Sequence, residues 1–426
     1  MPSNFSLTGH GACQEVGRSA FVLDFGEKFL LDYGVKLNIN DIEYPSEITE
    51  HVKAAIISHA HLDHSGLLPY FYKNTSCLSF MTQPTLELAD ILWKDSIKIA
   101  EFEGLAPKYN KQEIEQTHKY NFVVPYHKKL NLTHNVSLEF FDAGHILGSA
   151  LTKITHGEKS FLYTGDYKVD ETQLHLGADI DVGPIDYVMI ESTYGDREHP
   201  DRKLEEKAFC ESVQSTVERG GWAIVPVLAI GRSQEIIDIL SKYKIDAPIF
   251  FDGMAKQVAE VYLKYADLIK DSKGLRKALN GVNWVQGKQA RAKALKQPSI
   301  IVSTSGMMKG GPVQNYVKKI INDPRSKIHL TSFQAEGTPG KMLLEEGKIP
   351  QDDGKIVKVG CRYEKFDFSA HPSQSEMIRS LKKWSPKEIF LVHGDKPVMD
   401  IFAKKIRDEI GIKSTILAPG KKIDFS

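Results

Sequence analysis

Short apolar runs that alternate with amphipathic stretches predict an α/β protein. Residues 20–33 have the pattern of a hairpin around Gly26. Five later apolar runs each lead into a polar residue that can do chemistry, and these residues are His59, His145, Asp166, Glu191 and His393. In open α/β sheets, ligands bind beyond the carboxyl ends of the strands. The shared pattern therefore predicts one site that is assembled from many loops.

The pattern changes from about residue 200. Apolar positions at helical spacing over 203–219 predict a helix, and they are followed by a strand at 222–229 and a helix over 232–243. A strand at 248–251 and a helix through the 250s and 260s come next. After residue 365 the strands that lead into polar residues return. The sequence thus predicts a catalytic domain that is interrupted by an inserted α/β domain.

Composition adds the broad class. The chain has 426 residues, of which 41% are hydrophobic and 26% charged, as in a soluble globular protein of more than one domain. The 55 Lys and Arg balance the 55 Asp and Glu, which excludes a globally basic nucleic-acid binder but not a locally basic groove. Residues 264–296 are rich in Lys and Arg; a solvated helical face and a strip facing nucleic acid are the two interpretations.

Targeting and redox signals favour a cytoplasmic protein. The N-terminus has no charged head with an apolar run, so we expect no signal peptide. No apolar stretch approaches the roughly 20 residues that a membrane span needs. The four cysteines are far apart and form no CxxC pair, which predicts reduced thiols rather than disulfides or a thiolate zinc site.

The string SHAHLDHSG carries the strongest chemical signal. It places His59, His61, Asp63 and His64 within six residues, after a buried strand and before a predicted helix start at Ser65. Imidazole nitrogen and carboxylate oxygen are ligands suited to zinc. In an extended segment alternate side chains point the same way, so the first two histidines can bind one ion while the next two residues reach a neighbouring ion.

Further ligands are expected from other strands. His145 is the natural third imidazole for the first ion, and Asp166 can bridge both ions because each of its oxygens can bind one. His393 would complete the second ion, while Asp32 would accept the other ring N–H of a zinc-bound histidine. Two zinc ions per chain would lower the pKa of a shared water and neutralise charge on a phosphoryl or acyl oxygen.

These motifs resemble the metallo-β-lactamase superfamily. HAHLDH matches its HxHxDH motif, and Asp32, His145 and Asp166 match its further motifs. The whole chain resembles the β-CASP branch, the RNA-processing nucleases: ESTYGDR, FSAHPSQSE and LVHGD supply Glu191, His371 and His393 as its three acidic and histidine motifs. The inserted domain also matches, in the strings VPVLAIGRSQE and STSGMMKGGPV.

The resemblance implies a fold and a subgroup. It implies an αββα metallo-β-lactamase sandwich in two parts, residues 1–197 and 366–426, interrupted by a β-CASP domain over 198–365. A histidine in the third motif is typical of RNA-directed members. HAHLDHSG looks more like the endonuclease subunit of the cleavage and polyadenylation specificity factor than like RNase J. The chain resembles a compact prokaryotic or archaeal homologue without KH domains.

The resemblance also implies roles for single residues. Asp63, Glu191 and His371 are the catalytic residues, with Glu191 holding one nitrogen of His371 so that the other can protonate a leaving 3′-oxygen. Hydrolysis would leave a 5′-phosphate and a 3′-hydroxyl. The candidates for contacts to RNA phosphates are the following four residues: Ser369, Gly310, Gly311 and Arg232.

Three functions are compatible with these residues. The first is a two-zinc nuclease for single-stranded RNA, cutting internally or in a 5′-to-3′ exonuclease mode, for which a homodimer and partners in an RNA-processing complex are conceivable. The second is a zinc hydrolase for a small ester or phosphodiester. The third is a non-catalytic RNA-binding scaffold, against which the full set of metal ligands argues. Manganese could occupy the same ligands.

Overall fold

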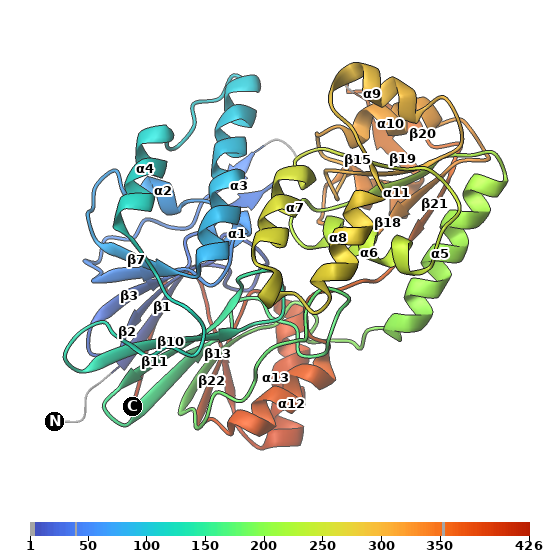
Figure 1. Cartoon of the computed structure of the whole chain (residues 1–426). Helices are drawn as coiled ribbons and strands as arrows, with labels where there is room; N and C mark the ends of the chain where they lie inside the picture. The colour runs from blue at the N-terminus through green and yellow to red at the C-terminus, as the bar shows by residue number, and fades with distance from the viewer. Residues whose placement is uncertain (1–4, 39–40, 352–353) are drawn as a thin grey trace. The chain divides into compact units, whose positions relative to one another are not determined.

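The computed structural model describes residues 5–38, 41–351 and 354–426 and divides into two compact units. Unit 1 is formed by Met1–Glu198 together with Ala370–Ser426, and unit 2 by His199–Ser369. Unit 2 is therefore an insertion within unit 1 (Figure 1). The sequence-based domain boundaries, after residues 197 and 365, stay predictions.

Unit 1 is built on two seven-stranded sheets. The first sheet has the order β24-β1-β2-β3-β6-β7-β8 and comprises β1 (Phe5–Gly11), β2 (Ala20–Asp24), β3 (Lys28–Leu31), β6 (Ala54–Ile56), β7 (Leu78–Met81), β8 (Asn121–Val123) and β24 (Lys422–Phe425). The second has the order β23-β22-β13-β12-β11-β10-β9 and comprises β9 (Leu130–Asn131), β10 (Val136–Asp142), β11 (Ala150–His156), β12 (Lys159–Tyr163), β13 (Tyr187–Glu191), β22 (Glu388–Val392) and β23 (Ser414–Ile416).

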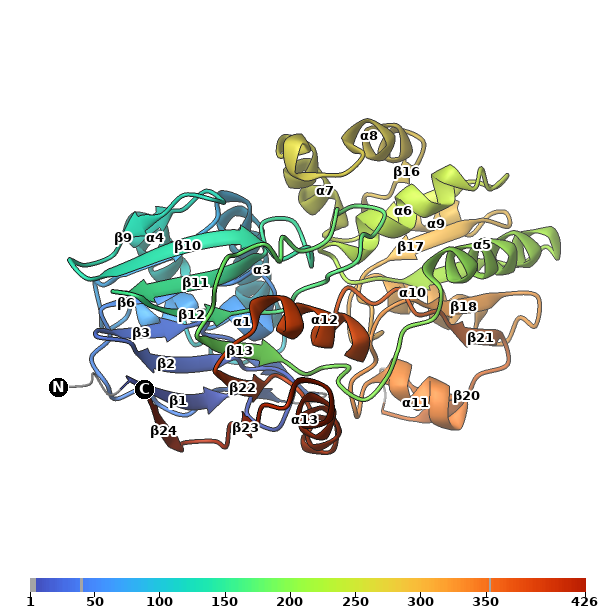
Figure 2. The same ribbon diagram turned by 90° about the horizontal axis from the view of Figure 1, so that it is seen from below.

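Two apolar layers hold unit 1 together. One layer fills the space between the sheets and includes Phe29, Phe140 and Phe390. The other lies between the second sheet and two helices, α12 (Gln374–Trp384) and α13 (Lys396–Ile410), which Figure 2 shows against β13 and β22. The remaining helices of the unit are α1 (Leu62–Ser65), α2 (Leu68–Phe71), α3 (Gln83–Phe102) and α4 (Lys111–Tyr120), and a small ribbon is formed by β4 (Lys36–Leu37) and β5 (Ile42–Glu43).

The arrangement of the strands explains the apolar runs of the sequence. β2 and β3 form the predicted antiparallel hairpin. β12, β13 and β22 are mutually parallel and almost wholly buried, so their sequences are continuously apolar. Because parallel strands end at the same edge of a sheet, the residues that follow them are brought together there.

Unit 2 is built on one parallel six-stranded sheet with the order β16-β15-β17-β14-β18-β21. Its strands are β14 (Ala223–Pro226), β15 (Ile249–Asp252), β16 (Asn283–Trp284), β17 (Ile300–Ser303), β18 (Lys327–Leu330) and β21 (Arg362–Lys365), with a hairpin of β19 (Lys348–Pro350) and β20 (Ile356–Lys358). Its helices are α5 (Arg202–Glu218), α6 (Arg232–Lys242), α7 (Ala255–Lys264), the 3₁₀ turn η1 (Ala266–Leu268), α8 (Ser272–Asn280), α9 (Gly287–Ala294), α10 (Val313–Ile320) and α11 (Pro339–Glu346).

The predicted fold class, an αββα sandwich interrupted by an α/β domain, is confirmed. Within the described part of the chain, no helix has both the length and the apolar character that crossing a bilayer would demand. The strand predicted over 222–229 is shorter, because its pairing with β17 stops at Pro226.

Candidate functional site

The histidine-rich motif of unit 1 leaves β6 as an extended segment and then turns into a short helix. α1 begins at Leu62, so the prediction of a helix start at Ser65 was wrong. The amides of His64 and Ser65 donate to the carbonyl of His61, at 3.0 and 2.8 Å, and close the turn three residues earlier. Asp63 and His64 therefore project from a helical turn, in a different direction from the residues of the extended segment before them.

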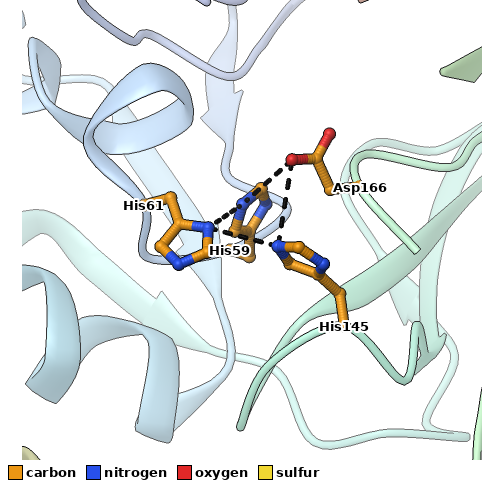
Figure 3. A group of neighbouring side chains, drawn as sticks. All are labelled: His59, His61, His145 and Asp166. Carbon is orange, nitrogen blue, oxygen red and sulfur yellow. Dashed lines mark hydrogen bonds and ion pairs between the residues drawn. The ribbon is translucent and has the colours of Figure 1, made fainter. Parts of the chain in front are cut away.

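The first group of candidate ligands contains His59, His61, His145 and Asp166 (Figure 3). His61 Nδ1 lies 3.2 Å from Nε2 of both His59 and His145. Asp166 Oδ2 lies 3.7 and 3.9 Å from the same two Nε2 atoms. These four side chains come from two widely separated parts of the sequence and converge on one point.

The second group shares Asp166 with the first and adds Asp63, His64 and His393. Asp166 Oδ1 lies 3.3 Å from His64 Nε2 and 3.3 Å from His393 Nδ1. Asp63 Oδ2 lies 3.4 Å from His393 Nε2 and 3.8 Å from His64 Nε2. The two oxygens of Asp166 thus face two different donor sets.

Hydrogen bonds on the far side of three imidazoles, those of His59, His64 and His145, fix which nitrogen faces the site. Asp32 is fully buried, and its carboxylate lies 2.7 Å from His64 Nδ1. It also accepts hydrogen bonds from the Ser58 amide and hydroxyl and from the Tyr163 hydroxyl. With Nδ1–H pointing at a carboxylate, Nε2 is the nitrogen of His64 that faces the site.

Two of the three histidines of the first group are held in the same way. His59 Nδ1 lies 3.0 Å from Ser58 Oγ, and His145 Nδ1 donates to the carbonyl of Ala370 at 2.7 Å. Burial, together with neighbouring imidazoles, holds the pKa of His59 and of His145 well below the usual range. Both rings are therefore neutral and have Nε2 lone pairs directed at the first group.

The backbone is constrained where the ligands leave their strands. Asp32 and His393 have φ angles of 56° and 50°, in the left-handed region that costs energy for residues other than glycine. Gly144, next to His145, has φ 67°, and a Cβ there would lie 2.5 Å from the amide nitrogen of Ala178. Such conformations persist at sites where the surrounding structure determines them.

Both groups have the dimensions of a zinc site. Zinc–nitrogen distances of about 2.0–2.1 Å in a tetrahedron place neighbouring donors roughly 3.4 Å apart. Donor separations of 3.2–3.9 Å surround the first point and 3.3–3.8 Å the second. Asp166 Oδ1 is buried and accepts no hydrogen bond within the described residues. An imidazole lone pair and a carboxylate oxygen 3.3 Å apart repel each other unless a proton or a cation lies between them.

The pKa shifts in the second group also indicate that a proton or a cation lies between its donors. Burial opposes protonation of His64, but the carboxylates of Asp166 and Asp63 raise its pKa well above the usual range. Burial also acts to raise the pKa of Asp166, yet the surrounding histidines, His393 first, hold it well below that of an ordinary carboxyl. The site thus has an excess of negative charge that only bound protons or cations can balance.

A third group joins the bridging carboxylate to a histidine and a glutamate. His371 Nδ1 lies 3.0 Å from both oxygens of Glu191 and 4.0 Å from Asp166. Glu191 also accepts hydrogen bonds from the amide of Tyr167 and the hydroxyl of Thr193, at 3.0 and 2.6 Å. Burial lowers the pKa of His371, but the charge of Glu191 and then that of Asp166 outweigh burial and raise it to about 9.

The four predicted phosphate-binding residues all belong to unit 2, with Ser369 at its end, two residues before His371. The guanidinium of Arg232 is buried, where it donates to Glu235 and to the carbonyl of Phe368, so it is held within the unit. Ser369 is half-buried, and its amide donates to Asp367. Gly310 and Gly311 are exposed, with φ of 68° and 72°. Phosphate binding by these residues stays a prediction.

Several supporting residues were not found from the sequence. Ser58, Thr193 and Tyr163 hold the side chains described above through single hydroxyl groups. Lys168 and Glu376 form a buried ion pair beside the loops of Asp166 and His371. The only sequence signal for them is their proximity to the motifs, because a hydroxyl or an ion pair has no spacing rule of its own.

Comparison with known proteins gives the family. Residues 22–182 match the family model of a metallo-beta-lactamase superfamily domain, and residues 233–343 match that of a Beta-Casp domain. Residues 356–418 match a Zn-dependent metallo-hydrolase RNA specificity domain. The chain belongs to the metallo-β-lactamase superfamily, in its β-CASP branch. It is therefore a metal-dependent hydrolase, and the resemblance and enzyme class expected from the sequence are confirmed at this level.

Relatives of this β-CASP protein span most of its length. It is 39% identical to Probable RNase MJ4 of Methanocaldococcus jannaschii, over 91% of this chain and 92% of that protein. It is 32% identical to RNase aCSPSF2 of Saccharolobus solfataricus, over 99% and 86% of the two chains. A crystal structure of a protein of unknown function from Enterococcus faecalis shares the fold, with a TM-score of 0.62, 11% identity, and coverage of 99% of this chain and 100% of that one.

Proposed function

We propose that the protein is a two-zinc ribonuclease that hydrolyses phosphodiester bonds of single-stranded RNA in RNA processing or decay. The observation that supports this most directly is the position of Asp166, whose two oxygens face two separate donor sets. One ion needs one such set, so two sets that share a bridging carboxylate fit a pair of ions. Relatives that are named RNases support RNA as the substrate.

His59, His61 and His145 would hold one zinc ion, and Asp63, His64 and His393 the other, with Asp166 between them. When bound, such a pair of ions makes a water molecule nucleophilic at neutral pH and neutralises charge on the phosphoryl oxygens. The residues around them then decide which bond breaks.

Glu191 and His371 are proposed to act on the leaving group. With its pKa raised to about 9, His371 carries a proton at neutral pH. Water adds to phosphorus, the bond from phosphorus to the 3′-oxygen breaks, and the imidazolium protonates that oxygen through the nitrogen that does not face Glu191. The products are a 5′-phosphate and a 3′-hydroxyl, and the proton released by the attacking water balances the one donated.

The test is cleavage of a long single-stranded RNA labelled at either end, with zinc content measured in the same samples. We expect wild type to release internal fragments and to hold about two zinc ions per chain. His64→Ala should lose zinc and activity, whereas His371→Ala should keep zinc and lose activity. His134→Ala is the matched control, because His134 is an exposed histidine outside the three groups.

Other outcomes separate the alternatives. Mononucleotides released only from the 5′ end would identify a 5′-to-3′ exonuclease mode of the same chemistry. An enzyme that binds two zinc ions and leaves RNA intact would refute the ribonuclease and favour a small ester or phosphodiester as substrate. The homodimer, further complex partners and replacement of zinc by manganese stay predictions.

A further inference from the structure

The two units carry opposite net charges. Of the 55 basic and 55 acidic residues, unit 2 (residues 199–369) holds 28 Lys and Arg against 20 Asp and Glu, a net charge of +8. Unit 1 holds the other 27 basic and 35 acidic residues, a net charge of −8. The zero net charge of the whole chain therefore conceals a charge difference of 16 between its units.

The positive charge of unit 2 is concentrated in one segment. Residues 272–322 contain ten Lys and Arg and no Asp or Glu in 51 positions. In a chain with equal numbers of acidic and basic residues, a segment of this length would ordinarily contain both kinds. The segment runs from α8 through β16, α9 and β17 to α10 (Figure 2).

Most of these charges are exposed and lack an acidic partner. Three of the ten have partners: Arg291, whose Nε lies 2.7 Å from Asp252, and Lys309 and Lys318. Seven others are exposed and take part in no ion pair with the described residues: Lys273, Arg276, Lys277, Lys288, Lys293, Lys296 and Lys319. The structure of unit 2 thus leaves seven positive charges open to solvent.

α8 shows the arrangement most clearly. Lys273, Arg276 and Lys277 share one exposed face, while Leu275 and Leu279 are buried on the other face of the helix. Like charges three and four residues apart destabilise a helix. A helix face adapted only to solvent would mix signs, as α13 of unit 1 does by pairing Lys396 with Asp400 and Lys405 with Glu409.

We propose that the exposed basic residues of segment 272–322 bind the phosphate backbone of single-stranded RNA outside the reacting phosphodiester. This rests on the proposed function and adds a second contact region to it. A polyanion with one charge per nucleotide complements a surface of one sign, whereas a typical protein surface carries both signs. Arg and Lys on phosphates supply affinity without sequence preference.

The experiment measures binding and cleavage separately. Three triple variants are compared: K273Q/R276Q/K277Q on α8, K288Q/K293Q/K296Q on and just after α9, and the control K382Q/K396Q/K405Q, whose lysines are ion-paired in unit 1. Affinity for a long fluorescent single-stranded RNA is measured against salt concentration in zinc-loaded protein. The binding series carries His371→Ala in every variant, so that RNA is not cut during the measurement.

If all three charges of a triple variant contact phosphates, the slope of log affinity against log salt falls in magnitude by about 2. We expect this for the α8 and α9 variants, together with a higher KM for long RNA than in wild type, and an unchanged slope for the control. Equal slopes in all three variants would overturn the proposal. The proposal would also be overturned by a basic-residue variant that no longer binds polyglutamate but keeps the RNA affinity of wild type. That result would favour an acidic protein partner.

Failure of the proposed function would look different. If the α8 variant lowers the salt slope of binding to long RNA but wild type cleaves no RNA, the nuclease would be refuted and the binding surface would stand. If wild type cleaves RNA but every variant has the same slope and the same KM, the nuclease would stand and the binding surface would be refuted.

Discussion

Replacement of Lys168 by Met should destabilise unit 1 although Lys168 contacts no candidate ligand. Its Nζ lies 2.8 and 2.6 Å from the two carboxylate oxygens of Glu376. The side chains are 10% and 5% exposed, so the pair is buried. Glu376 also accepts hydrogen bonds from the amides of Asp170 and Ser373, which connect the loop after Asp166 to the start of α12.

The magnitude follows from the charge that is left behind. Removing one partner of a buried ion pair typically costs 3–5 kcal/mol, because the other charge stays buried without compensation. Two backbone amides still reach Glu376 in Lys168→Met, so we expect the lower end, about 3 kcal/mol. For a domain of this size that corresponds to a fall in melting temperature of roughly 6–12 °C.

The effect should depend on pH in a definite direction. Burial acts to raise the pKa of Glu376, but the charge of Lys168 and the hydrogen bonds lower it below the ordinary 4.5. A lowered pKa in the folded state gives stability that is present above the unfolded pKa and is lost as pH falls through the folded one. In Lys168→Met the carboxyl can protonate near its unfolded pKa, so the difference from wild type should shrink in acid.

The assay is thermal unfolding of zinc-free and zinc-loaded protein between neutral and acid pH. Lys396→Met serves as the control, since its ion pair with Asp400 is exposed and is expected to contribute nothing measurable. Equal melting temperatures for wild type and Lys168→Met at neutral pH would refute the reasoning. A loss of stability that grows towards acid pH would also refute it, because it would have the wrong sign for a buried carboxylate.

Three further changes test the site directly. Asp32→Asn should lower zinc affinity about 10–100-fold, measured by competition with a chelating dye, because the carboxylate that orients a ligand imidazole is lost; unchanged affinity would contradict this role. In wild type, kcat/KM should fall as pH rises towards the His371 pKa of about 9, and bound cations would move that fall lower. Glu191→Gln should shift this fall of kcat/KM to still lower pH, towards the ordinary histidine pKa of 6.5. A pH profile identical to that of wild type would count against the role of Glu191 in raising the pKa of His371. Gly144→Ala should lower both melting temperature and zinc content, since its Cβ would lie 2.5 Å from backbone; a stable, zinc-replete variant would refute the close approach.

The sequence was sufficient to single out the candidate ligand residues that the structure brings together. Buried parallel strands are continuously apolar, so the first polar residue after each one is conspicuous, as with His393 after β22. The insertion was also visible, because the strand pattern stops near residue 200 and returns after 365. Both signals are local properties of the chain that follow from burial and strand periodicity.

The orientation of these side chains could not be predicted from the sequence. The helical turn at Leu62 depends on amides that reach back to His61, and it separates the directions of neighbouring motif residues. Ala370 holds His145 with a carbonyl group, which any residue possesses, so no side-chain pattern marks it. Arg232 shows the same limit, because its place at a helix start suggested a phosphate contact but did not reveal that its guanidinium lies buried against Glu235.

Asp166 joins the two halves of the site, so a change that moves this residue affects both halves. Asp166 contributes one oxygen to each donor set and is also 4.0 Å from His371. Its position is fixed from both sides, by the loop after β12 and by the ion pair of Lys168 two residues later. Under the proposed function, a shift of this carboxylate would disturb both candidate metal positions and the surroundings of His371 together, so we expect variants of this loop to lose zinc binding and leaving-group protonation at the same time.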